Sequence, residues 1–156
     1  MRKKRVYKKH FEPDPEFGRI DVSRFINYVM HDGKRSTAEK VFYDSLKEVE
    51  KQTKEKGIEV FEKALENVSP MLQVVSRRVG GANYQVPMEV TPERKFVLAS
   101  RWLIGAARGK KGKGMARKLA EEFIAATKNE GAAIKKKQDT HRMAEANRAF
   151  AHFARR

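Results

Sequence analysis

The chain has 156 residues, with 35 Lys and Arg against 20 Asp and Glu, which gives a net charge of +15. Because like charges repel, so basic a chain is expected to have an anionic partner, either a nucleic acid or an anionic membrane. No apolar run approaches the ~18 residues of a membrane-spanning helix, and the absence of cysteine excludes disulfides, thiolate zinc sites and cysteine nucleophiles. We therefore expect a cytoplasmic, single-domain protein with no membrane partner.

The positive charge is concentrated in three segments. Residues 1–10 and 108–118 each hold six Lys or Arg and no acid, and 135–142 holds four more. By contrast, 39–66 holds eight acids and six bases. A single basic run is often only solvated surface. Three runs around an acidic middle predict a basic face directed at a polyanion.

Residues 1–18 are predicted to form an extended basic arm. They include Pro13 and Pro15 and too few apolar residues to bury, so we expect no fixed order before the arm meets a partner. The remainder of the chain, 19–156, is predicted to form a single helical domain.

Helical periodicity begins directly after the arm. Apolar residues recur at the spacing of one helix face at Val22, Phe25, Ile26, Val29 and Met30. Asp21 is the predicted N-cap of this helix and Gly33 is its predicted C-cap. A second helix is predicted to open with a capping box, Ser36 to Glu39, and to fade after Val49.

The stretch "SRRVGGANYQVPMEV" differs because apolar and polar residues alternate after Gly80 and Gly81. The alternation predicts a β-hairpin at about 71–90, with the two glycines at its tip. A free two-stranded ribbon is marginal in water, so the hairpin must lean on the body or on a partner. Arg77 and Arg78 bring two cations beside the tip, where the glycines let another backbone approach closely.

The other helices flank this hairpin. They are predicted over 58–68, from Thr91 through Ala107, from Ala116 to Gly131, and from Ala132 to near Phe153. Ser69 with Pro70 stops the first of these, and Thr91 with Pro92 starts the second. The predicted fold class is mainly α: a six-helix bundle with one protruding two-stranded β-hairpin arm and an extended basic N-terminal arm.

The sequence contains no motif that indicates an enzyme. The histidines stand at no metal-ligand spacing: His10, His31, His141 and His152. Gly109 and Gly114 imitate a phosphate loop, but Met115 occupies the position that requires lysine. We therefore expect no catalytic residue, metal, cofactor or small-molecule substrate.

The helix that begins at Thr91 carries Arg94, Arg101 and Arg108 at intervals of seven residues, on one stripe beside the apolar one. Guanidinium groups at this spacing suit a row of phosphates. The alternative is that they pair with glutamates of the second and third helices. Lys34 and Arg35 stand beside the start of the second helix, where free N–H groups favour a phosphate.

Four stretches, "SRRVGGANYQVPMEV", "DGKRSTAEKVFYDS", "ALENVSP" and "DTHRMAEANRAFAH", resemble signature stretches of the bacterial small-subunit ribosomal protein seven family. The resemblance covers essentially the whole chain. It implies a helical bundle with a protruding β-ribbon, in a structural protein without enzymatic activity. Such a protein is expected in the cytoplasm, within the small ribosomal subunit, bound directly to the 3′ major (head) domain of the rRNA and nucleating head assembly.

The same resemblance implies the neighbours and the contact residues. The ribbon and last helix are expected near exit-site tRNA and the path of the messenger, beside other head proteins and protein eleven of the subunit. The implied rRNA-binding residues are Arg2, Lys3, Lys4, Arg5, Lys34, Arg35, Arg77, Arg78, Arg94, Arg101, Arg108, Lys110, Lys111, Lys113, Lys135, Lys136, Lys137 and Arg142.

From the residues alone, two other classes remain open. One is an architectural DNA-binding protein whose ribbon enters the minor groove, although a Gly-Gly tip lacks the apolar wedge that such proteins insert. The other is a nuclease, for which the sequence offers no acid that stands out.

Overall fold

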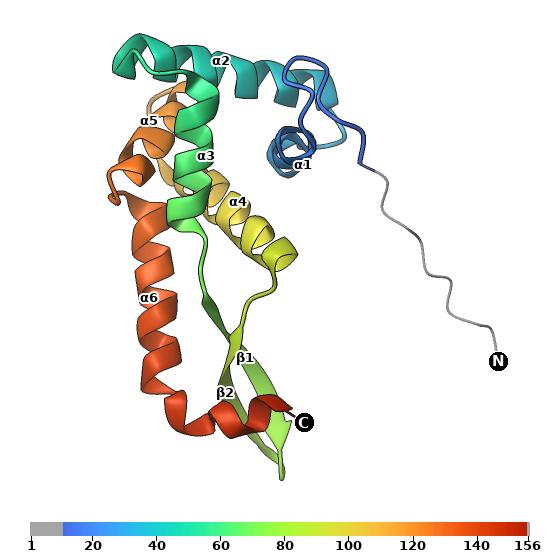
Figure 1. Ribbon diagram of the computed structural model, residues 1–156, viewed down its shortest axis with the longest axis vertical. Coiled ribbons are helices and arrows are strands. Elements are labelled where there is room, and N and C mark those ends of the chain that lie inside the picture. Colours follow the sequence, from blue (N-terminus) through green and yellow to red (C-terminus); the bar gives the residue numbers. More distant parts are fainter. Residues whose placement is uncertain (1–10, 156) are drawn as a thin grey trace, which may run out of the picture.

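The computed structural model describes residues 11–155 (Figure 1). Its elements are α1 (Ile20–Val29), α2 (Arg35–Thr53), α3 (Gly57–Val68), β1 (Leu72–Val79), β2 (Ala82–Glu89), α4 (Pro92–Gly109), α5 (Met115–Thr127), α6 (Ala132–Ala146) and the 3₁₀ helix η1 (Arg148–Arg155). The predicted fold class, a mainly helical bundle with one two-stranded hairpin, is confirmed. Within 11–155, no helix is long and apolar enough to cross a membrane.

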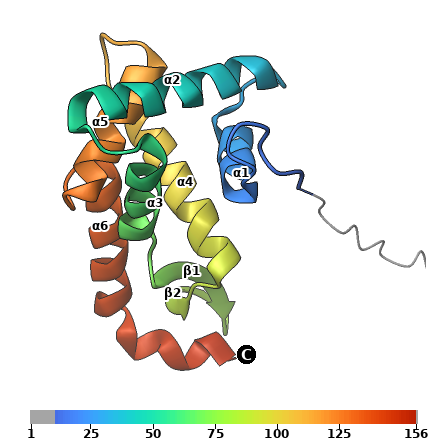
Figure 2. The same ribbon diagram turned by 45° about the horizontal axis from the view of Figure 1, so that its top comes forward.

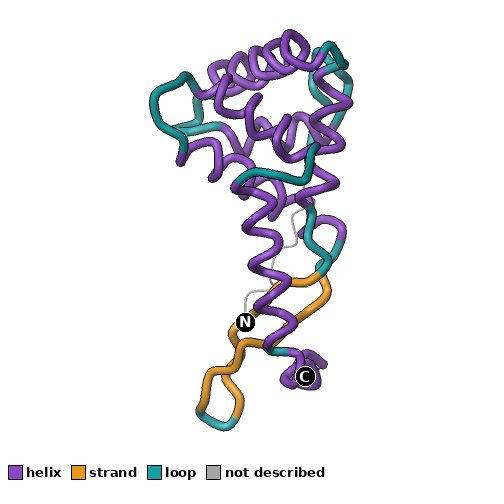
Figure 3. The backbone as a smooth tube through the Cα atoms, turned by 90° about the vertical axis from the view of Figure 1, so that its left-hand side faces the viewer, coloured by secondary structure: helices purple, strands orange, loops and turns teal. Residues whose placement is uncertain are grey.

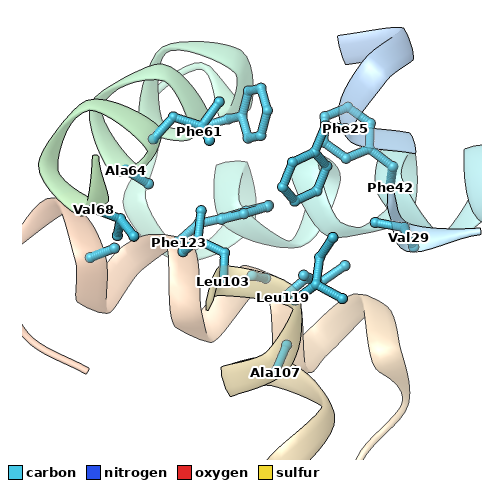
Figure 4. Close-up of a cluster of buried hydrophobic side chains, with 14 of the residues drawn as sticks. Phe25, Val29, Phe42, Phe61, Ala64, Val68, Leu103, Ala107, Leu119 and Phe123 are labelled. Atoms are coloured by element: carbon cyan, nitrogen blue, oxygen red, sulfur yellow. The ribbon is translucent and has the colours of Figure 1, made fainter. Parts of the chain in front are cut away.

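The core lies where α1, α2, α3 and α5 meet (Figure 4). Each of these helices contributes one fully buried phenylalanine: Phe25, Phe42, Phe61 and Phe123. The ring of Phe61 meets the other three edge to face, at centroid distances of 4.9, 5.2 and 5.4 Å. Aromatic pairs in this geometry contribute about 0.5–1.5 kcal/mol each beyond their burial. The cluster therefore holds four helices around one point, and the buried Leu103 of α4 joins it.

The ribbon projects from one end of the helical body, beside α6 (Figures 1 and 3). Its register pairs Leu72 with Glu89 and continues to Val79 and Ala82, which leaves Gly80–Gly81 as a two-residue turn. Both glycines have positive φ, +57° and +89°, as in the type I′ turn that suits a twisted ribbon. The hairpin predicted from the alternation is therefore confirmed.

The C-terminal end of the chain braces the ribbon. The ring of Tyr84 in β2 lies 5.2 Å from that of Phe150 and 5.4 Å from that of Phe153. Arg77 in β1 donates a hydrogen bond to the carbonyl oxygen of Phe153 at 3.0 Å. The last helix, predicted to run on to near Phe153, is therefore in two parts. α6 ends at Ala146, and η1 turns across the ribbon (Figure 2).

The predicted N-caps of α1 and α2 are wrong. α1 begins at Ile20, so Asp21 lies inside its first turn and pairs with Arg19 at 2.7 Å. α2 begins at Arg35 and has no side-chain cap, because Glu39 forms an ion pair with Arg35 at 2.8 Å. In both cases an arginine beside the helix start takes the carboxylate that the prediction assigned to capping.

Two predicted glycine stops, and the serine of the capping box, also differ from the structure. Ser36 lies within α2, and Met30 rather than Gly33 follows the last residue of α1. Gly131 precedes α6 instead of ending α5, with φ of +95°. A Cβ at this position would lie 2.8 Å from Oε1 of Glu122. Glycine is therefore required both by the backbone conformation and by the close approach of the Glu122 carboxylate.

Residues 11–18, predicted as part of an unordered arm, are packed against α2. Asp14 is only 1% exposed and accepts hydrogen bonds from the backbone N–H groups of Glu16 and Phe17, at 3.2 and 3.1 Å. It accepts a third from the hydroxyl of Tyr43 at 2.7 Å. The prediction of an unordered segment is therefore wrong for 11–18, while 1–10 lies outside the described residues.

Candidate nucleic-acid interface

The three arginines of α4 lie on its exposed face. The guanidinium group of Arg94 donates to Oε1 of Gln73 at 3.4 Å, and that of Arg101 lies 5.9 Å from the ring centroid of Tyr28. Arg108 donates to the backbone carbonyl of Val29 at 3.2 Å. Within 11–155, none of the three arginines has a carboxylate at ion-pair distance. The alternative that they pair with glutamates of α2 and α3 is therefore wrong for this part of the chain.

These contacts place Arg101 and Arg108 beside α1, and Arg94 beside the first strand of the ribbon. Gln73 belongs to the base of the ribbon, whereas Tyr28 and Val29 belong to α1. Beyond Val29, Arg108 and Lys34 line the same groove of about 330 Å³ between the α1–α2 loop and the start of α5. We call Arg94, Arg101, Arg108 and Lys34 the basic strip.

The basic loop between α4 and α5 has a different environment. Nζ of Lys110 lies 2.9 Å from Oε2 of Glu122, a carboxylate that is 1% exposed, and Lys113 pairs with Glu121. The hydrogen bond from Lys113 lowers the pKa of Glu121. Lys111 is exposed and has no ion pair among the described residues. Two of the three loop lysines are thus compensated by α5.

The buried carboxylate of Glu122 in α5 contacts both the α4–α5 loop and the start of α6. The sequence analysis did not predict these contacts. Its Oε1 accepts a hydrogen bond from the backbone N–H of Ala133, in the first turn of α6, at 3.0 Å. A carboxylate at this end of a helix is favoured by the helix dipole. Lys110 supplies the counter-charge on the other side of the carboxylate. Lys110 therefore has a structural role that the family resemblance did not indicate.

The cations of α6 lie away from the basic strip, because α6 and α1 are on opposite sides of α4 (Figures 1 and 2). Lys135 and Lys136 are exposed, and Arg142 has only a long contact with Asp139 at 4.0 Å. Lys137 is half-buried: it donates to the backbone carbonyl of Asn67 at 2.6 Å, and burial lowers its pKa. The described cations of the predicted set are thus divided between two sides of the molecule.

His141 links α6 to the base of the ribbon. Its Nε2 accepts a hydrogen bond from the backbone N–H of Met71 at 3.2 Å. Burial, with a smaller contribution from Lys137, lowers the pKa of His141. This histidine therefore has a packing role, and no group of three or more His, Asp or Glu within 11–155 could hold a metal ion.

The two ribbon arginines have different environments because successive residues of a strand point to opposite faces. Arg77 is half-buried and donates a hydrogen bond to the carbonyl oxygen of Phe153. Arg78 is exposed, opposite Asn83 in the register. The turn glycines are exposed as well, and a Cβ added at either would meet nothing within 4 Å.

Five predicted residues remain: Arg35 at the start of α2, and four residues near the N-terminus. Arg35 is paired with Glu39 and also donates to Ser23 Oγ at 3.4 Å. Arg2, Lys3, Lys4 and Arg5 lie outside the described residues. The sequence prediction omitted Arg24 of α1, whose guanidinium lies 5.1 Å from the ring centroid of Phe11 and 4.6 Å from that of Phe96 on α4. Its position one residue before the buried Phe25 was the only sequence signal.

Comparison of the sequence with known proteins shows the family of the chain. A family profile described as "Ribosomal protein S7p/S5e" matches residues 1–148. The "Small ribosomal subunit protein uS7" of Cytophaga hutchinsonii is 55% identical over 153 residues, and that of Thermotoga maritima is 56% identical over 153 residues; each match covers 98% of this chain and 99% of the relative. The protein of the same name from Maricaulis maris is 54% identical over 97% of both chains. The chain therefore belongs to the ribosomal protein S7p/S5e family.

Proposed function

We propose that this chain binds the 3′ major (head) domain of the small-subunit rRNA directly, through the basic strip, and helps to nucleate assembly of the head. As a member of its family, the chain is a structural, non-enzymatic protein of the small ribosomal subunit in the cytoplasm, and binding to rRNA follows from that membership. The proposal adds the part of the RNA and the part of the protein that meet.

The observation that carries the proposal is the environment of the α4 arginines. They are exposed, and within 11–155 none has a carboxylate at ion-pair distance; their contacts are to an amide oxygen, an aromatic ring and a backbone carbonyl. The positive charge of such an arginine is not offset by a carboxylate, and most of its five N–H donors are available to a ligand. A row of these groups matches the phosphates of an RNA backbone.

Specificity is expected from the shape of the folded RNA more than from base edges. The deep and narrow major groove of A-form RNA hides its bases from side chains, whereas the phosphates and 2′-hydroxyls stay accessible. The strip follows the junction of two rigid helices, so its cations have a fixed spacing. A folded RNA junction with matching phosphate positions would be selected over a simple duplex.

The ribbon is proposed to lie near exit-site tRNA and the messenger path, with protein eleven and other head proteins as neighbours. In support, the ribbon projects away from the helical body, carries the exposed Arg78 next to its turn, and is braced by η1 (Figure 3). A braced projection can reach a second ligand without moving the body.

Footprinting of small-subunit rRNA with and without the protein tests the proposal. Protection confined to the head domain is the expected result, and protection elsewhere, or none, would contradict it. If about six to ten phosphates are contacted, affinity should also fall ~10³–10⁵-fold between about 50 and 200 mM salt.

A second measurement separates RNA from DNA as the ligand. Lysates are treated with RNase or with DNase, and the sedimentation of the protein is followed. RNase alone is expected to release the protein from a heavy particle. Release by DNase alone would instead favour the architectural DNA-binding class.

A further inference from the structure

Cationic and aromatic side chains form a continuous row across the junction between α1 and α4: Arg24, Phe96, Tyr28 and Arg101. Arg24 and Tyr28 belong to α1, whereas Phe96 and Arg101 belong to α4. The guanidinium group of Arg24 lies 4.6 Å from the ring centroid of Phe96, and that of Arg101 lies 5.9 Å from the centroid of Tyr28. The two rings are in contact with each other, at a centroid distance of 6.4 Å. The row therefore has an arginine at each end.

The two arginines have different surroundings. Arg24 is half-buried and contacts a second ring, that of Phe11, at 5.1 Å. Arg101 is exposed, and within residues 11–155 its one ring contact is with Tyr28. Neither arginine has a carboxylate at ion-pair distance among these residues. The Arg101 end of the row can therefore take a further flat group, as Arg24 does with its second ring.

A guanidinium group that lies over an aromatic ring is well suited to stack on a nucleobase. The group is planar, and contact with one ring orients it while its second face stays open. Its N–H donors point outward in the plane, where they can still reach phosphate oxygens. Unpaired RNA bases are commonly stacked on aromatic rings or on guanidinium planes.

We propose that Arg101 and Tyr28 form a stacking site for one unpaired base of the rRNA, with the guanidinium group between the ring and the base. Arg94 and Arg108 stand about 10 Å away along α4 on either side and bind backbone phosphates there. Arg101 touches the base, and Tyr28 is a positioning residue. The inference rests on the proposed function and deepens it, because this site selects an RNA with an unpaired nucleotide at one point of the basic strip.

Lysine substitutions separate stacking from charge, because lysine keeps the cation but has no flat group. Arg101→Lys should weaken binding to a head-domain rRNA fragment about 5–20-fold, through loss of one base stack. Arg94→Lys and Arg108→Lys remove no stack and should weaken it about two- to threefold each. All three variants should keep the same salt slope, since the number of neutralised phosphates does not change. Equal losses at the three positions would overturn the inference.

A matched control lies outside the basic strip. Arg117 is an exposed arginine of α5 with a long contact to Glu48 at 4.0 Å. Arg117→Lys makes the same chemical change as Arg101→Lys and should leave the affinity for the fragment unchanged. A loss as large as that of Arg101→Lys would show that lysine is poorly tolerated anywhere on the surface, and would overturn the stacking site.

Tyr28 is tested by removing either its ring or only its hydroxyl. Tyr28→Leu should weaken binding about 3–10-fold, and Tyr28→Phe should recover most of that loss because the ring face remains. In a double-mutant cycle, Tyr28→Leu should cost little more in the Arg101→Lys protein, since both changes remove the same stack. Additive losses would overturn the inference. Tyr28 packs partly against the core, so urea unfolding verifies that each variant is folded.

Two short ligands show whether a base is the group that Arg101 holds. Oligoadenylate is compared with an abasic ribose-phosphate oligomer of the same length and charge. The unmodified protein should bind oligoadenylate more tightly, and Arg101→Lys should remove this preference by weakening the binding of oligoadenylate alone. Equal affinity of the unmodified protein for the two ligands would overturn the stacking site.

These outcomes are distinguishable from a failure of the proposed function. If the unmodified protein binds the head-domain fragment no better than a simple RNA duplex, the proposed function is contradicted, and the base preference on the short ligands is still measured. If the head-domain fragment is preferred but oligoadenylate and the abasic oligomer bind equally, only the stacking inference is overturned.

Discussion

The basic strip and the loop between α4 and α5 are similar in sequence but opposite in environment. Both are rich in Lys or Arg. The arginines of the strip lie along α4, and the loop follows the C-terminal end of the same helix. On the strip, arginines contact neutral groups and keep their charge for a ligand. In the loop, Lys110 and Lys113 are paired with carboxylates of α5. The number of cations in a segment therefore does not measure the charge that it presents to RNA.

Replacing all three strip arginines should have the largest effect. Arg94→Ala, Arg101→Ala and Arg108→Ala together should lower affinity for the head-domain rRNA fragment by roughly 100-fold or more at low salt, because each loses a charged phosphate contact. The free energy of unfolding should change much less than the free energy of RNA binding. The control replaces Lys113, the loop lysine that is paired with Glu121, by Ala, and a loss of affinity as large per residue in that control would remove the distinction between the two regions.

Lys110→Met should show the reverse, a loss of stability with little loss of affinity. It leaves the buried carboxylate of Glu122 without its counter-charge. Breaking a fully buried pair costs ~3–5 kcal/mol, and because Lys110 is partly exposed we expect about 2–3 kcal/mol. Urea unfolding measures the change. A variant with unchanged stability and strongly weakened RNA binding would place Lys110 in the interface instead.

Gly105→Ala should stabilise the protein without altering binding. Gly105 is exposed in the middle of α4, and a Cβ added there would meet nothing within 4 Å. Alanine is favoured over glycine inside a helix by about 0.8–1.0 kcal/mol. Affinity for the rRNA fragment should stay within about twofold, since long arginine side chains make the contacts. A large loss of affinity would show that RNA touches the helix backbone itself.

The smallest expected effect concerns pH. Burial lowers the pKa of His141 in the folded protein, so below about pH 6.5 the unfolded chain binds more protons at this residue. The free energy of unfolding should therefore fall as the pH drops through this region. The difference between the unmodified protein and His141→Gln isolates the contribution, and identical pH profiles would contradict it. The His141→Gln substitution should leave the affinity for RNA unchanged, because His141 lies at the base of the ribbon and not on the basic strip.

The helices and the ribbon could be predicted from the sequence because apolar spacing and the Gly80–Gly81 pair are local signals. Thr91 followed by Pro92 also predicted the start of α4. The starts of α1 and α2 could not be predicted, since a carboxylate such as Glu39 can cap a helix or pair with an arginine such as Arg35 four residues earlier. The family resemblance named the four cations of the basic strip, whose contact with RNA stays a prediction. It could not tell Arg77, held by Phe153, from the exposed Arg78, because that difference depends on where η1 folds back.

The contacts of Asp14 and Glu122 were the least predictable part. Each is a single carboxylate, which hydropathy alone predicts to be exposed. Its burial depends on partners distant in sequence: Tyr43 for Asp14, and Lys110 with the start of α6 for Glu122. Only the assembled bundle brings these groups together.

Because the chain contains no cysteine, a single cysteine can carry a tethered hydroxyl-radical source at a chosen position. Gly105→Cys places the source on α4 among the strip arginines, and Lys63→Cys places it on the exposed side of α3. Strong cleavage of head-domain rRNA from position 105, with little from position 63, is expected if RNA lies along the basic strip. Equal or stronger cleavage from position 63 would contradict that placement.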